Sequence, residues 1–225
     1  MSIDDGEHII SSLSASYPLE SANRLMALLQ PHAFIATPSS ISRGKRHYSF
    51  TVSGIHQIYI VMEGVFCARR RIDRKVVGTF ISPVILGWSG IGKDCKSSTY
   101  LNSIYLEPRN TGKLMVIPLQ EAYTLVSKAG ALMDVVELLS FNVNHLLIMG
   151  GDISDVRAQE IVLKMLRRLV SIPESMRSEF SVVNFIEERC MLARSTILRE
   201  LGKLRQHGII EMKNGRLVSL LIDDD

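Results

Sequence analysis

The sequence has few of the features that mark exported, membrane-spanning or metal-clipped proteins. Its three cysteines, Cys67, Cys95 and Cys190, are too few and too widely spaced for a disulfide framework or a Cys-x-x-Cys metal clip. No window contains the roughly eighteen uncharged apolar residues that cross a bilayer. The first residues, Met1–Glu7, are acidic where a signal peptide is basic. We therefore expect a cytoplasmic protein that has no membrane partner.

Charge of one sign is also scarce, because the formal net charge is only +3 and charged residues make up 22% of the chain. This balance does not indicate nucleic-acid binding by the whole molecule, and 46% hydrophobic residues are ordinary for a folded protein. A chain of 225 residues suits two modest domains. Between Val156 and Ile222, however, twelve Lys or Arg stand against seven Asp or Glu. The C-terminal end thus has a mild positive bias.

Catalytic patterns are missing as well. The six histidines form no pair at metal-ligand spacing, and the sequence supports no nucleophile–base–acid set. Gly87 and Gly92-Lys93 match most of a P-loop, but Asp94 stands where Ser or Thr would bind magnesium, and no helix pattern follows. We therefore expect no enzyme, no catalytic residue, no metal and no cofactor.

One cysteine is a candidate redox sensor. Cys67 is followed closely by Arg69, Arg70 and Arg71, and nearby cationic side chains make a thiolate reactive. The alternative is that Cys67 is an inert small hydrophobic residue, as most unpaired cysteines are. The positively charged segment Arg69–Lys75 could attract an anion or could be a solvated hairpin tip.

The N-terminal half predicts an antiparallel β-sandwich or barrel after one or two short helices that end before Pro31. From Phe34 to Ile117, short β-rich runs alternate with Gly, Pro, Ser and Asn. The clearest of these runs are Ile55–Val65, Val76–Ile81, Tyr100–Leu106 and Leu114–Ile117.

A long helix is predicted next. Apolar residues follow a 4, 3, 4, 3 spacing, which places them along one seam of a helix of about twenty residues. The seam predicts a homodimer, and the alternative is a helix packed on its own domain. The seam residues are Leu132, Val136, Leu139, Val143 and Leu146.

The last seventy or so residues predict a winged helix-turn-helix. Ser181 is placed to cap a helix, Cys190–Leu192 to form a tight turn, and Ala193–His207 to form a second helix that Gly208 ends. The strands Ile209–Met212 and Arg216–Leu221 close around Lys213-Asn214-Gly215, a strong hairpin signal. The second helix turns Ile197, Leu201 and Leu204 inward and leaves a polar stripe of Ser195, Thr196, Arg199, Lys203 and Gln206.

This arrangement predicts a DNA reader. Arg bonds the O6 and N7 atoms of guanine at once, whereas Ser, Thr and a helix N-terminus suit phosphates. Helix-turn-helix folds also serve as protein–protein modules, so the alternative of an adaptor protein that does not bind DNA stays open. The candidate DNA-binding residues are Arg194, Ser195, Thr196, Arg199, Lys203, Lys213 and Arg216.

With a sandwich, a long seam helix and a winged helix in this order, the chain resembles the Crp/Fnr superfamily of regulators. The stretch Leu192–Arg199 is similar to that family's recognition helix, with Arg194 and Arg199 at its two arginines. Ser195 stands where the family usually has Glu, and Met191 stands where it has a turn glycine. The DNA sequence that this chain recognises therefore need not be the one that the family recognises. The resemblance implies an α+β fold with a cyclic-nucleotide-binding-like β-roll (a jelly-roll sandwich, 1–128), a dimerisation helix (129–151) and a winged helix-turn-helix (152–225). It also implies double-stranded promoter DNA, a second copy of the chain and RNA polymerase as partners.

More narrowly, the chain resembles the IprA/YaiV type of winged-helix regulators. The matching runs are Glu63–Val65, Val183-Asn184, Arg194-Ser195 and Ile210–Met212. This resemblance implies a role linked to oxidative stress or virulence genes, which composition and spacing do not indicate.

The expected sensor lacks known effector groups. In the segment Ile85–Asp94 no Glu follows Gly87, and there is no Arg between Gly87 and Arg109. A cyclic phosphate would therefore lack its usual partners. The four cysteines of an iron–sulfur sensor are also absent. We therefore expect a degenerate sensor that does not bind cyclic AMP, while activation by an unidentified small ligand in the β-roll stays open. Operator, sign of regulation and signal cannot be read from the sequence.

Overall fold

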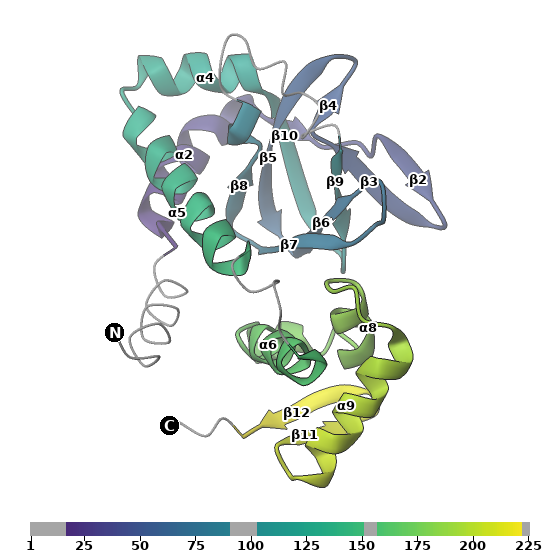
Figure 1. Ribbon diagram of the computed structural model, residues 1–225. Coiled ribbons are helices and arrows are strands. Elements are labelled where there is room, and N and C mark those ends of the chain that lie inside the picture. The colour runs from purple at the N-terminus through teal and green to yellow at the C-terminus, as the bar shows by residue number, and fades with distance from the viewer. Residues whose placement is uncertain (1–16, 91–102, 151–156, 222–225) are drawn as a thin grey trace. The chain divides into compact units, whose positions relative to one another are not determined.

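The computed structural model describes residues 17–90, 103–150 and 157–221, and within these ranges the side chains of 145–150 and of Ser175 are outside the description. The chain divides into two compact units (Figure 1). The first comprises the described parts of 1–72 and 78–152, and the second those of 73–77 and 153–225. None of the described helices is long and apolar enough to cross a membrane.

Two antiparallel sheets form the centre of the first unit. One has the order β1 (Phe34–Ile35), β10 (Lys113–Pro118), β5 (Ile55–Glu63), β4 (Thr51–Val52), with β8 (Val84–Leu86) also paired to β5. The other has the order β2 (Ser40–Ser42), β3 (Lys45–Ser49), β9 (Ile104–Pro108), β6 (Val65–Arg70), β7 (Val76–Ile81). The predicted antiparallel sandwich is confirmed.

Two predicted strands differ in their bounds. Ile55–Val65 is not one strand, because Gly64 has a φ of 93° and a Cβ at this position would lie 2.8 Å from the Cα of Gly112. The chain turns there from β5 into β6. Of the predicted strand Tyr100–Leu106, the described part begins as β9 at Ile104 and continues to Pro108, while residues 100–102 lie outside the described residues.

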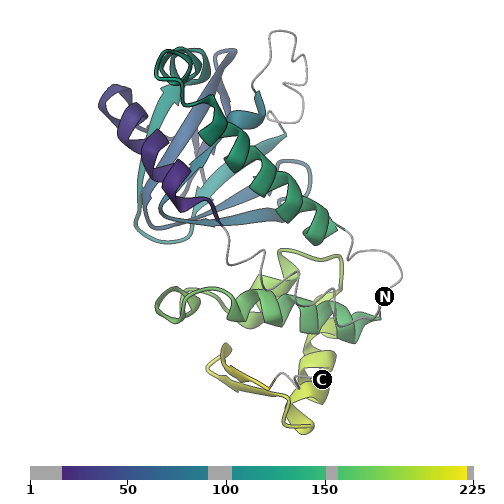
Figure 2. The same ribbon diagram turned by 90° about the vertical axis from the view of Figure 1, so that its left-hand side faces the viewer.

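Strand β5 is buried on both faces, which explains its unbroken apolar run. Ile58 and Ile60 belong to the core under the helices, whereas Tyr59 and Val61 belong to the core between the sheets. The helices α2 (Leu19–Leu29), α4 (Leu119–Lys128) and α5 (Leu132–Gly150) cover the outer face of this sheet (Figures 1 and 2). The unit therefore has three layers: helices, sheet and sheet.

Aromatic side chains fill the space between the two sheets. Tyr48, Phe50 and Phe66 each approach a neighbouring ring edge-on, with centroids 5.5 to 6.3 Å apart. The hydroxyl of Tyr59 donates a hydrogen bond to the carbonyl of Ser49 at 2.7 Å, and burial raises the pKa of Tyr59 above its ordinary value. The interior of the roll is thus a packed core.

Helix α5 has two apolar faces. Val135 and Leu138 are buried in the core under the helices, and Leu139 packs partly against it. The other face carries Leu132, Val136 and Val143, which are 41%, 48% and 53% exposed. The side chain of Leu146 lies outside the described part. The helix therefore packs on its own domain through one face and leaves most of the predicted seam uncovered within the described chain.

Within the described residues, the second unit contains four helices and a hairpin. They are α6 (Ala158–Val170), α7 (Glu174–Arg177), α8 (Val182–Glu187), α9 (Arg194–Gln206), β11 (Ile210–Lys213) and β12 (Arg216–Leu220). Their buried side chains, among them Leu166, Phe185 and Ile197, form the core of this unit. The predicted helix–turn–helix–wing order is confirmed. The connection between α8 and α9 runs from Glu188 to Ala193, which is longer than the predicted Cys190–Leu192 turn.

The ends of these helices explain how the wing is fixed. After α9, Gly208 has a φ of 71°, and the N–H of Ile209 donates to the carbonyl of Leu204 at 2.9 Å, which closes a Schellman motif. Ser181 is the residue before α8, but its side chain makes no capping bond. Instead, the N–H of Val182 donates to the carbonyl of Gly215 at 2.9 Å, so the turn of the wing satisfies the start of α8.

Candidate nucleic-acid interface

Helix α9 presents one fully exposed face. Ser195, Leu198, Arg199 and Gly202 follow an i, i+3, i+4, i+7 spacing, which places them side by side, and all four are exposed. The opposite face, with Ile197, Leu201 and Leu204, is buried. A helix anchored in this way can enter the major groove of DNA with its exposed face toward the bases.

The side chain of Arg199 is anchored to the neighbouring Glu200 through one of its nitrogens. Its Nε donates to the Oε1 atom of Glu200 at 3.0 Å. The two terminal Nη groups make no hydrogen bond or ion pair within the described residues. Because a guanine is read through two parallel N–H donors, an Arg anchored by Nε keeps the required pair available.

Lys203 shares the same anchor. Its Nζ donates to both carboxylate oxygens of Glu200 at 3.1 and 3.0 Å, and Glu200 itself is only 3% exposed. Hydrogen bonds from Lys203 and then from Arg199 hold the pKa of Glu200 below its usual range. Lys203 therefore lies on the flank of the exposed face, as does the half-buried Thr196.

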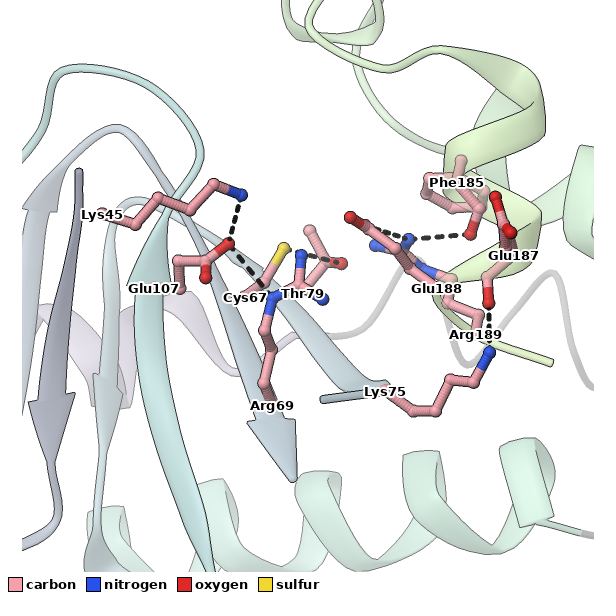
Figure 3. Close-up of polar contacts among 10 residues, drawn as sticks. All are labelled: Lys45, Cys67, Arg69, Lys75, Thr79, Glu107, Phe185, Glu187, Glu188 and Arg189. Atoms are coloured by element: carbon pink, nitrogen blue, oxygen red, sulfur yellow. Dashed lines mark hydrogen bonds and ion pairs between the residues drawn. The ribbon is translucent and has the colours of Figure 1, made fainter. Parts of the chain in front are cut away.

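Arg194 points toward α8. Its Nη1 donates to the Oε2 of Glu187 at 2.7 Å and to the Oδ1 of Asn184 at 3.4 Å. The backbone carbonyl of Glu187 also accepts a hydrogen bond from Lys75 (Figure 3). Lys75 lies in the segment 73–77, which belongs to the second unit. An exposed ion pair of this kind is weak, at about 0–1 kcal/mol, so a phosphate could replace Glu187 as the partner of Arg194.

The wing carries the other two candidate residues. Lys213 and Arg216 lie opposite each other at the end of the hairpin, and both are exposed. Asn214 and Gly215 between them have φ values of 52° and 75°, as the predicted tight turn requires. Two cations on a rigid two-residue turn suit contacts with a DNA backbone.

Two residues of the exposed face were missed by the sequence analysis, which looked only for polar side chains. Leu198 is 50% exposed, although a leucine on a soluble helix is usually placed inward. Gly202 lies in the middle of α9, where glycine costs about 1 kcal/mol relative to alanine. A Cβ on Gly202 would meet no atom within 4 Å, so its own fold does not require a glycine there.

The region of the expected sensor cassette is described as far as Gly90. Gly87 has a φ of 110°, and a Cβ there would lie 2.4 Å from the carbonyl oxygen of Gln57. Close packing on β5 therefore explains this glycine without a bound phosphate. Gly92, Lys93 and Asp94 lie outside the described residues.

The arginines beyond Cys67 are occupied by partners. Glu107 is 4% exposed and accepts hydrogen bonds from Arg69 Nε and Lys45 Nζ, both at 3.1 Å (Figure 3). Cys67 is fully buried, with its Sγ 3.8 Å from the Oγ1 of Thr79. Burial of the thiol and pairing of Arg69 favour the interpretation of Cys67 as an inert core residue. Cys95 lies outside the described residues.

Comparison with known proteins agrees with this architecture. Residues 158–223 match the family model described as winged helix-turn-helix DNA binding. The inhibitor of hydrogen peroxide resistance from Escherichia coli K12 is 24% identical over 162 residues, which cover 72% of this chain and 75% of that protein.

Two solved structures have a similar fold over most of their length. The c-di-GMP-responsive global regulator CLP of Xanthomonas campestris is 16% identical with a TM-score of 0.62, covering 89% of this chain and 100% of CLP. A Crp/Fnr-family regulator from Eubacterium rectale is 14% identical with a TM-score of 0.57, covering 92% and 95% of the two chains. The chain therefore combines a segment that matches a winged helix-turn-helix DNA-binding family with a β-sheet domain whose fold resembles that of these two regulators.

Proposed function

Since a winged helix-turn-helix DNA-binding domain follows a Crp/Fnr-type β-roll in this chain, we propose that it is a cytoplasmic, sequence-specific transcription regulator that binds promoter DNA as a homodimer. The exposed face of α9 carries the proposal. It presents an Arg199 fork anchored through Nε and, at its N-terminal turn, Ser195. Lys213 and Arg216 of the wing supply phosphate contacts on a second element.

Dimerisation is proposed through α5. Its exposed apolar residues Leu132, Val136 and Val143 repeat along one face, and an apolar stripe of this kind is costly to leave in water. A second copy of the same helix would cover it and would present two recognition helices to two half-sites.

The β-roll is proposed to act without cyclic AMP. The aromatic residues between the sheets fill the interior, and the sequence offers no Glu after Gly87 and no nearby Arg for a cyclic phosphate. Similarity to the Escherichia coli inhibitor of hydrogen peroxide resistance supports target genes in the peroxide response. Transcript profiles of a deletion strain with and without hydrogen peroxide would test that link.

The direct test is a binding measurement on a site selected from random DNA. Replacing Arg199 by Ala should weaken binding to the selected site by about 1–3 kcal/mol and binding to random DNA much less, because a bidentate base contact carries sequence information. Lys128→Ala is the control for loss of one exposed cation, since Lys128 is exposed in the last turn of α4, outside the winged helix-turn-helix. It should leave the ratio of specific to random affinity unchanged.

Two results would contradict the proposal. An Arg199→Ala protein that is folded and dimeric and keeps both the footprint and the specificity ratio of the wild type would exclude α9 as the reader. Absence of salt-dependent DNA binding by the wild type would favour an adaptor, because phosphate contacts release counterions and make binding salt-dependent.

A further inference from the structure

Leu198 and Gly202 are the two residues of the exposed α9 face that the fold of the chain does not account for. They are one helical turn apart, so the leucine side chain lies beside a position that has no side chain. Half of Leu198 is exposed, and a Cβ at Gly202 would meet open space. Together they form a small apolar spot next to Arg199.

We propose that Leu198 and Gly202 form the binding site for the 5-methyl group of a thymine in each half-site. This inference rests on the proposed function, because it requires α9 to lie in the major groove. Among the four bases only thymine presents a methyl group there, next to its O4 acceptor, and apolar side chains read it by contact. The absent side chain at Gly202 lets the helix backbone approach the base edge closely enough for that contact.

The surroundings of the spot favour DNA over an apolar protein partner. Arg199 and Lys203 flank it on the same helix, Arg194 precedes it by one turn, and Lys213 and Arg216 lie on the wing. The carboxylates of Glu187 and Glu200 are already paired with Arg194, Arg199 and Lys203. A polyanion with one apolar group at the centre of the contact matches this distribution of charge.

The test replaces thymine by deoxyuridine, which removes only the methyl group. In a selected site, each thymine is changed in turn to deoxyuridine in both half-sites, and the dissociation constant is measured for wild type and for Leu198→Ala. At one position the wild type should lose about fourfold in affinity per half-site, the value of burying one methyl group. Leu198→Ala should bind the thymine and deoxyuridine sites equally at that position.

Gly202→Ala provides an independent measurement. Alanine is the better helix former, so the melting temperature should rise, whereas affinity for the selected site should fall about tenfold because the new methyl group would occupy the space of the base edge. A purely structural glycine would not separate the two readouts in this way. Ser219→Ala, exposed on β12, is the control for a small exposed substitution.

The outcomes separate this inference from the function on which it rests. A flat deoxyuridine scan, or a deoxyuridine penalty that persists in Leu198→Ala, overturns the thymine site, even where Arg199→Ala abolishes specificity as expected. Unchanged affinity of Gly202→Ala contradicts the close backbone approach. If the wild type binds no DNA, both the function and the thymine site are wrong.

Discussion

The residues in the interior of the β-roll stabilise the fold, whereas several residues on the exposed face of α9 do not. Between the sheets, large side chains such as Tyr59 and Phe66 are buried against one another, so stability explains each of them. On α9, Leu198 is half exposed, Gly202 weakens its own helix, and the Nη groups of Arg199 have no partner within the described residues. Residues that cost stability without a return inside the chain indicate a partner outside it.

The largest expected effect tests the packed interior of the β-roll. Phe66→Ala should lower the free energy of unfolding by about 3–5 kcal/mol, because a buried ring leaves a cavity in a packed core. Phe34→Ala is the matched control: Phe34 is 69% exposed, and its loss should change stability by less than about 0.5 kcal/mol. Urea unfolding of the three proteins measures both. Similar midpoints for Phe66→Ala and Phe34→Ala would contradict a packed roll.

The next effect concerns the uncovered face of α5. Val136→Glu should weaken dimerisation by about 3 kcal/mol or more, because two carboxylates would be buried near the symmetry axis without partners. Light scattering over a dilution series measures the dimer constant. Val52→Glu is the control, since Val52 is similarly exposed, at 41%, but lies on β4. A wild type that is monomeric at micromolar concentration would show that α5 is not a dimer seam.

The sequence predicted the wing and the end of α9, but it did not single out Leu198 and Gly202, and both results have identifiable reasons. The hairpin of the wing followed from Asn214-Gly215 and the end of α9 from Gly208, because both depend on local backbone conformation. Pairings between distant segments could not be predicted. Glu107 with Lys45 and Arg69, and Glu187 with Arg194, join residues whose approach the tertiary fold decides. Leu198 and Gly202 were within reach, since helical spacing alone places them beside Arg199.

A smaller effect is expected at the wing. Lys213→Ala and Arg216→Ala should each weaken binding to selected and random DNA to a similar degree and lower the slope of log affinity against log salt by about one. Lys128→Ala, exposed at the end of α4, should leave the slope unchanged. Titrations at four salt concentrations measure the slopes. A change of specificity without a change of slope would mean that the wing reads bases and does not bind phosphates.

The smallest effect is expected at Glu200, a buried residue that contacts the exposed face of α9. This carboxylate is buried, yet its bonds go to Lys203 and Arg199, the cations of the reading face. Its pKa in the folded protein is lowered, so its contribution to stability is present above the ordinary pKa of glutamate, about 4.3, and is lost as the pH falls through the folded value.

Glu200→Gln should therefore be less stable than the wild type from pH 5 to 8, and the difference should shrink as the pH falls below about 4.3, because the wild-type carboxyl then becomes neutral as well. Urea midpoints across this range measure the difference, with Glu211→Gln, exposed on β11, as the control for loss of one negative charge. At pH 7 the variant should also discriminate less between selected and random DNA, since the hydrogen bond from Arg199 Nε then ends on a neutral amide oxygen and anchors the side chain less strongly. A stability difference independent of pH, together with unchanged discrimination, would mean that Glu200 packs in the domain without positioning Arg199.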